Sequence, residues 1–111
     1  MAKKTLDWHL AMADQQLEQR RGVNDQLSTA REVDHFAYFR KRAGAERAAE
    51  LLRADGFRVE LARKGFTTSL AAHIDSPVDP GSVRALVNRV FDAVESNGGD
   101  YDGWGGEVVT A

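Results

Sequence analysis

The fold is decided by residues 57–94, which read FRVELARKGFTTSLAAHIDSPVDPGSVRALVNRVFDAV. Apolar and charged side chains alternate over residues 57–61, and apolar side chains alternate with polar ones again over residues 69–74. Alternation with a period of two is typical of strands that bury one face. Lys64-Gly65 lies between the two runs and marks a turn, so the sequence predicts a β-hairpin.

A helix is predicted directly after this hairpin, over residues 80–97. Ser76-Pro77 breaks the second strand, and Asp79 followed by Pro80 is a favourable pair of N-cap and first-turn residues. The helix has the strongest amphipathic pattern in the chain, because one side gathers the apolar residues Val83, Leu86, Val87, Val90, Phe91 and Val94. We expect this side to pack on a sheet.

The flanking segments complete an α+β pattern. We expect a helix over residues 42–54, a strand over residues 31–39 before it, and a last strand over residues 100–110. The order strand, helix, strand, strand, helix, strand predicts a ferredoxin-like sandwich, in which two helices cover one face of a four-stranded antiparallel sheet. Residues 28–111 are assigned to this domain, and residues 1–27 to an N-terminal amphipathic helix packed on its core. The other face of the sheet is expected to be open.

Composition narrows the classes of function. A chain of 111 residues has room for one domain. It contains no cysteine, which excludes disulfides, thiolate metal sites and cysteine nucleophiles. Lys and Arg number 15 against 17 Asp and Glu, a balance unlike that of an obligate nucleic-acid binder. No apolar run suits a secretory signal or a membrane span, and we therefore expect a cytoplasmic protein.

Two histidines are the first candidates for a chemical site. Asp34 and His35 on one strand, with His73 and Asp75 on another, have the side chains of a metal site or an acid–base pair. Two histidines without a third ligand at a diagnostic spacing are more often structural, so we predict neither a metal nor a cofactor.

Lys64-Gly65-Phe66 begins like the signature of an RNA-recognition module, but the aromatic residues that should follow are absent. Direct nucleic-acid binding is therefore not expected.

Catalysis is the least supported class of function. No motif in the sequence brings together a nucleophile, a base and a group that stabilises charge.

The most unusual segment of the sequence is residues 98–106, GGDYDGWGG, which contains five glycines around two aromatic residues and two carboxylates. One interpretation is a bulged strand whose glycines let the aromatic rings pack on the backbone. The other is that Tyr101, Asp102 and Trp104 are presented to a partner protein, because partly exposed aromatic residues are favoured at interfaces.

Three motifs resemble one known family. The runs Tyr101-Asp102-Gly103-Trp104-Gly105, Val33-Asp34-His35-Phe36 and Gly56-Phe57-Arg58-Val59 are similar to those of the regulator of ribonuclease activity B family, also called ribonuclease E inhibitors. The resemblance covers about residues 28–110, and its distinctive part is the Tyr-Asp-Gly-Trp run. It implies a small cytoplasmic bacterial protein with a ferredoxin-like core and no catalytic activity of its own. It also implies binding to a ribonuclease E-type endoribonuclease, and thereby modulation of RNA decay.

The predicted site is a surface for a partner protein. The first and last strands of a ferredoxin-like sheet are neighbours, so the two strand motifs are expected to lie side by side. The residues assigned to this surface are Asp34, His35, Phe36, Tyr38, Tyr101, Asp102, Gly103 and Trp104. One alternative is a module that binds a small molecule or RNA on the open sheet face, with His35 and His73 as polar contacts. Another is a homodimer that uses this face and has no further site on it.

Overall fold

The computed structural model describes residues 3–111, and its secondary structure follows the predicted order. The elements are α1 (Leu6–Gly22), β1 (Arg31–Phe39), α2 (Arg42–Ala54), β2 (Arg58–Lys64), β3 (Thr67–Ser76), α3 (Pro80–Glu95) and β4 (Gly99–Gly106). The Asp79 carboxylate accepts the backbone N–H of Ser82, as expected of the N-cap of α3. No helix within residues 3–111 is long and apolar enough to cross a membrane.

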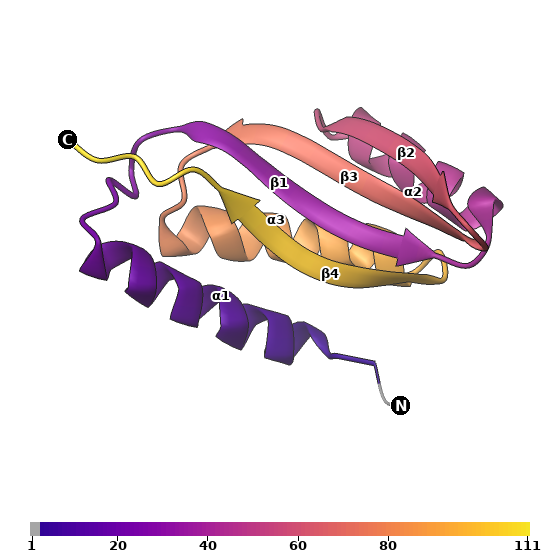
Figure 1. Cartoon of the computed structure of the whole chain (residues 1–111), viewed down its shortest axis with the longest axis horizontal. Coiled ribbons are helices and arrows are strands. Elements are labelled where there is room, and N and C mark those ends of the chain that lie inside the picture. Colours follow the sequence, from indigo (N-terminus) through magenta and orange to yellow (C-terminus); the bar gives the residue numbers. More distant parts are fainter. Residues whose placement is uncertain (1–2) are drawn as a thin grey trace.

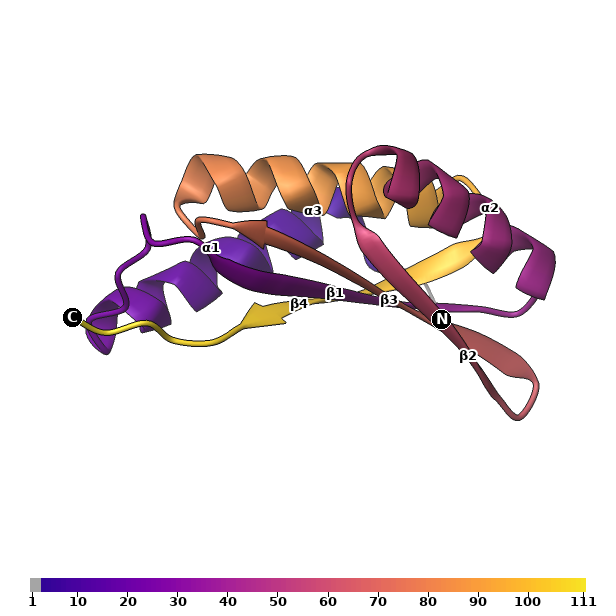
Figure 2. The ribbon, with the colours of Figure 1, turned by 90° about the horizontal axis from the view of Figure 1, so that it is seen from above.

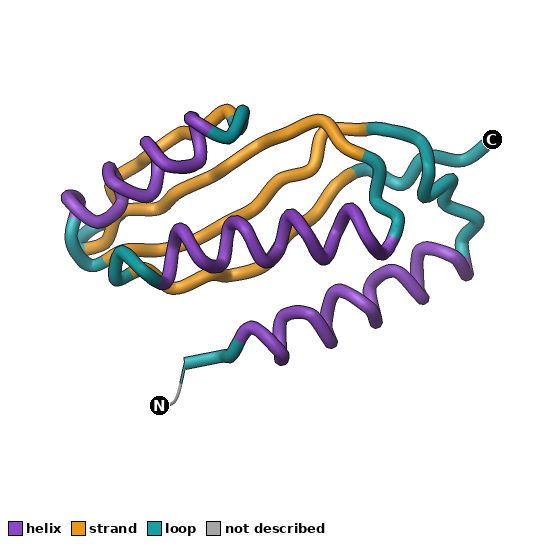
Figure 3. Tube along the Cα trace, turned by 180° about the vertical axis from the view of Figure 1, so that it is seen from behind, coloured by secondary structure: helices purple, strands orange, loops and turns teal. Residues whose placement is uncertain are grey.

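The four strands form one antiparallel sheet in the order β2-β3-β1-β4 (Figure 1). Helices α2 and α3 cover one face of this sheet, and no helix of the described chain covers the other (Figure 2). The predicted ferredoxin-like sandwich with an additional N-terminal helix is therefore confirmed. Helix α1 packs beside α3 and runs along the β4 edge (Figure 3).

The core lies between the sheet and its two helices. Helix α2 presents Ala45, Ala48 and Ala49, all fully buried, and these small side chains let it lie close to the sheet. Where β1 meets β4, the ring of Phe39 covers Gly99 so closely that a Cβ on this glycine would lie 2.4–2.8 Å from ring atoms. Helix α3 contributes the buried valines Val83, Val87, Val90 and Val94. The predicted amphipathic face of this helix is thus its core face.

Helix α1 and the residues before it satisfy backbone groups at the outer edge of β4. The Lys3 ammonium donates to the Gly99 carbonyl (2.7 Å), and the Arg20 guanidinium donates to the Gly106 carbonyl (2.8 Å). Strand β4 ends at Gly106, whereas the sequence predicted a strand to residue 110. The difference arises because the backbone at this end of β4 is bonded to arginine side chains rather than to another strand.

A buried ion network joins α1, β1 and the segment after β4. The Asp25 carboxylate is fully buried and accepts hydrogen bonds from Arg20 (2.9 Å) and Arg31 (2.6 Å). It also accepts the backbone N–H of Val109 (3.2 Å), while both guanidinium groups donate to the carbonyl of Glu107. Burial alone would raise the pKa of Asp25, but these hydrogen bonds outweigh it and hold the pKa below its ordinary value.

Candidate functional site

The orientation of β1 decides which of the predicted site residues can reach a partner. Odd-numbered residues of β1 point into the core and even-numbered ones point to the open face of the sheet. Phe36 and Tyr38 are therefore outward, with 41% and 40% of their surface exposed, and Asp34 lies on the same face. The sequence alone left this orientation open, because both faces of the strand carry apolar residues.

Strand β4 lies directly beside β1, as predicted from the topology. His35 pairs with Trp104, Phe36 pairs with Gly103, and the register then shifts by a bulge. Asp102 is exposed at this bulge, and Gly103 has a φ of 116°, a conformation that L side chains rarely adopt. We call the outward surface formed by Asp34, Phe36, Tyr38, Asp102 and Gly103 the β1–β4 patch.

His35 and Tyr101 belong to the core and not to this patch. His35 is 1% exposed, and its Nδ1 is hydrogen-bonded to the Tyr101 hydroxyl at 2.8 Å. Burial lowers the pKa of His35 to about 4 and raises the pKa of Tyr101 well above its ordinary value. The prediction that His35 is available to a partner is therefore wrong, because an odd position of β1 points inward. The alternative in which His35 and His73 line one pocket is wrong for the same reason, since His73 lies on the opposite face.

Trp104 is half-buried between β4 and α1. The Arg20 guanidinium lies 5.1 Å from the centre of its ring, and the Gln16 amide donates to its backbone carbonyl at 3.4 Å. The indole N–H is buried and has no hydrogen-bond partner among the described residues. The Trp104 ring thus packs against α1 while part of it stays accessible, whereas the prediction that Tyr101 is presented to a partner is wrong, because Tyr101 is 3% exposed.

A groove separates α1 from the bulged part of β4. It lies between Trp8, Met12 and Gln16 of α1 and Asp102, Gly103 and Trp104 of β4, and it encloses about 300 Å³. A second hollow of about 150 Å³ continues from it to Tyr38. We call the two together the α1–β4 groove. Sequence reasoning missed the α1 side of this groove, although Trp8 and Met12 flank the apolar stripe of the helix and were its available signal.

Comparison with known proteins now identifies the family. A model of the family described as regulator of ribonuclease activity B matches residues 11–106, most of the chain. The chain belongs to this family. The match includes most of α1 and all later elements, so the β4 wall of the α1–β4 groove and Met12 and Gln16 of its α1 wall lie within the matched region, whereas Trp8 lies before it. The comparison with curated proteins gives no match.

In this regulator-family chain, His73 is the centre of a polar cluster on the open sheet face. Its Nδ1 donates to Asp34 (2.6 Å) and its Nε2 donates to Glu60 (3.0 Å), while Glu32 lies 3.4 Å from Nδ1. Burial opposes a charge on His73, but the two hydrogen bonds outweigh it and raise the pKa of the imidazole. Glu32, Asp34 and His73 also place ligand atoms within 4.8 Å of one another, as a divalent cation would require. In the structure Asp34 is hydrogen-bonded to the His73 ring and Glu32 forms an ion pair with it.

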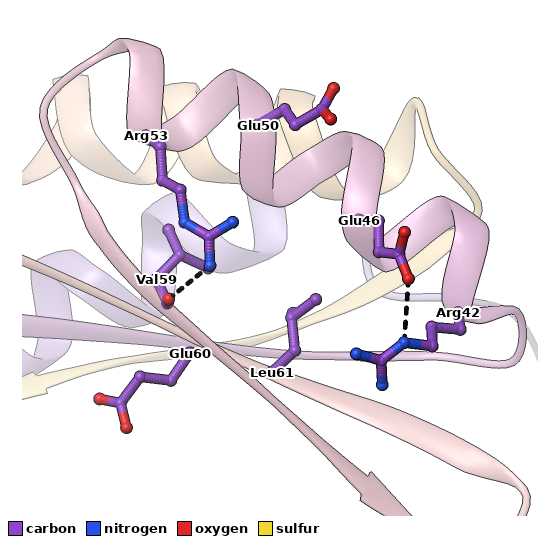
Figure 4. Close-up of a pocket in the computed structure, with 7 residues that line it drawn as sticks. All are labelled: Arg42, Glu46, Glu50, Arg53, Val59, Glu60 and Leu61. Atoms are coloured by element: carbon purple, nitrogen blue, oxygen red, sulfur yellow. Dashed lines mark hydrogen bonds and ion pairs between the residues drawn. The ribbon is translucent and has the colours of Figure 1, made fainter.

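A further hollow, of about 570 Å³, lies between α2 and the edge strand β2 (Figure 4). Both arginines that line it are paired with groups of the protein itself. Arg42 donates to Glu46 at 2.9 Å, and Arg53 donates to the carbonyl of Val59 at 2.8 Å. Figure 4 shows Glu60 turned away from α2, towards the sheet face that carries His73. This hollow is thus separate from the β1–β4 patch.

Proposed function

We propose that this protein is a non-catalytic regulator that binds a ribonuclease E-type endoribonuclease through the β1–β4 patch and thereby modulates RNA processing or decay. Membership of the regulator of ribonuclease activity B family supports the general role. The observation that carries the assignment of the surface is the pair of outward aromatic residues on β1, Phe36 and Tyr38.

The two rings project from a surface of small residues. Phe36 stands between Ala71 on β3 and Gly103 on β4, and Tyr38 stands opposite Ser69 on β3. Because these neighbours are short, the rings form the highest points of this part of the sheet. Aromatic side chains of this kind are enriched at the centres of protein interfaces, where they bury a large apolar area at small entropic cost.

The charges around the rings favour a basic protein partner. Asp100 and Asp102 lie beside them on β4, where no described residue forms an ion pair with either carboxylate. Glu32 and Asp34 precede them on β1, but their charge is partly balanced by Arg58 and His73. This acidic rim would repel nucleic-acid phosphates, and it would also repel a second copy of the same face. A ribonuclease carries basic surfaces for its RNA substrate, and such surfaces are complementary to the rim.

The test measures binding and cleavage with the purified ribonuclease E-type enzyme of the source organism. We expect Phe36→Ala and Tyr38→Ala each to weaken binding by roughly tenfold, as for aromatic anchors of an interface. Both variants should also shift the rate of RNA cleavage towards the rate seen without the regulator. The matched control is Phe66→Ala, because Phe66 is 96% exposed in the β2–β3 turn, away from the patch.

Circular dichroism establishes that each variant is folded. Equal loss of binding in the Phe66→Ala control, or wild-type binding by both patch variants, would contradict the assignment of the surface. Absence of any binding by the wild-type protein would contradict the proposed function itself.

A further inference from the structure

We propose that the α1–β4 groove receives a lysine or arginine side chain of the bound protein partner. This inference rests on the proposed function and extends it, because it adds a second contact point and states the chemistry of the partner group that fills it. The argument uses the aromatic walls of the groove, its carboxylates and the cations of the chain itself.

Aromatic rings from three elements border the groove. Trp8 on α1 is 41% exposed, Tyr38 on β1 faces outward, and Trp104 on β4 is half-buried. Behind them, His9 packs edge-on against Tyr101 with ring centres 4.7 Å apart, which fixes α1 against the strand. The exposed face of a tryptophan attracts a cation through the negative potential of its π system. The groove therefore presents a surface suited to a cationic side chain.

Carboxylates lie along the same groove. Asp100 and Asp102 are exposed on β4, and Glu95 at the end of α3 is partly buried close by. Burial lowers the pKa of His9 in the groove wall. The negative charges of Glu95, Asp100 and Asp102 raise this pKa, and the positive charge of Lys4 lowers it further. The three carboxylates are thus close enough to act on a charge in this wall. Combined with the aromatic walls, they select a cation over an anion.

The chain's own cations already use these groups. The Lys4 ammonium lies 4.5 Å from the centre of the Trp8 ring, and the Arg20 guanidinium lies 5.1 Å from that of Trp104. The Lys3 ammonium forms an ion pair with Glu95 at 3.2 Å. Arg20 is buried in the Asp25 network and stays in place, whereas Lys4 is exposed. A partner's cation can therefore replace Lys4 on Trp8, and Lys4 is its competitor.

Tryptophan fluorescence provides a direct readout, because the chain has 2 tryptophans and both line the groove. The probe is a short acetylated and amidated peptide with two arginines separated by glycine, titrated at low ionic strength. Its matched control replaces arginine with citrulline, which has nearly the same shape and no charge. We expect saturable quenching by the arginine peptide and at least roughly tenfold weaker binding by the citrulline peptide.

Variants of the full chain then test the groove itself. We expect Asp102→Asn to weaken arginine-peptide binding roughly threefold, and Lys4→Gln to strengthen it because the internal competitor is removed. The control is Asp75→Asn, which removes the same charge from an exposed position of β3 outside the groove and should leave binding unchanged. Circular dichroism confirms that each variant is folded.

Equal binding of the two peptides, equal effects of Asp102→Asn and Asp75→Asn, or weaker binding by Lys4→Gln would each overturn the proposal. Binding of the ribonuclease to the same variants is measured separately. If the enzyme binds the wild-type protein while the arginine peptide does not, the groove proposal fails and the proposed function stands.

Discussion

Acidification is expected to destabilise the protein through His35. In the folded state burial lowers the pKa of this imidazole from 6.5 to about 4, so the folded protein holds His35 neutral where the unfolded chain protonates it. The unfolded state then binds more protons than the native state, and the free energy of unfolding falls as the pH decreases from 6.5 towards 4. The stability that depends on a neutral His35 is fully present well above pH 6.5, where both states hold the imidazole neutral.

The size of the effect follows from the two pKa values. At about pH 5.5 the loss is roughly 1.4 kcal/mol, at about pH 4.5 it is roughly 2.5 kcal/mol, and its limit is about 3.4 kcal/mol. Two other histidines contribute to the pH dependence of the free energy of unfolding. The pKa of His9 is lowered, so its contribution also falls on acidification. The pKa of His73 is raised, so its contribution increases on acidification. The pKa of Asp25 is lowered, and its contribution is lost at more acidic pH.

The assay is urea unfolding of the wild-type protein and of His35→Gln at several pH values from about 7.5 to about 4.5. Glutamine cannot titrate and keeps a polar group that can bond to the Tyr101 hydroxyl, and all other titrating groups are common to both proteins. We expect the variant to be less stable at neutral pH, with the difference shrinking by about 2.5 kcal/mol on acidification. A difference that stays constant across this range would refute the reasoning.

Two further predictions concern single residues whose surroundings are well defined. Asp25→Asn leaves two buried guanidinium groups without their carboxylate and is expected to cost about 3–5 kcal/mol in urea unfolding, whereas Arg21→Gln, at an exposed ion pair, should change stability by less than about 0.5 kcal/mol. In Gly103→Ala the added methyl group would meet no atom within 4 Å, but an L residue would have to adopt a φ of 116°. We therefore expect the free energy of unfolding, measured by thermal unfolding, to fall by about 1–3 kcal/mol. Gly105→Ala also meets open space but has no positive φ, and a loss as large as that of Gly103→Ala would show that φ is not the cause.

The helices and strands could be predicted because each relies on local patterns. The alternation in the hairpin, the Asp79-Pro80 start of α3 and the Gly65 turn all act over a few residues. The end of β4 was misplaced because its cause lies far away in the sequence, in Arg20 and Arg31. Local propensity cannot reveal which distant side chain will bond a given carbonyl.

The candidate site was predicted only in part. The topology places the first and last strands side by side, and this much follows from element order. The element order does not predict which face of β1 is buried, because the inward residues Val33, Ala37 and Phe39 and the outward residues Phe36 and Tyr38 are both apolar sets. Only packing under α2 and α3 decides between the two faces. The position of α1 likewise depends on tertiary contacts, so its contribution to the groove was out of reach.

The contacts between α1 and β4 also determine how the sheet can grow. An edge strand with free carbonyls and N–H groups is a template for a strand from another molecule. On β4, Lys3, Gln16 and Arg20 occupy the carbonyls of Gly99, Trp104 and Gly106, and α1 runs along that edge. Intermolecular strand addition, whether in domain swapping or in aggregation, is therefore directed to β2. There the alternating charges of Arg58, Glu60 and Lys64 oppose it, so the protein protects its two edges by two different means.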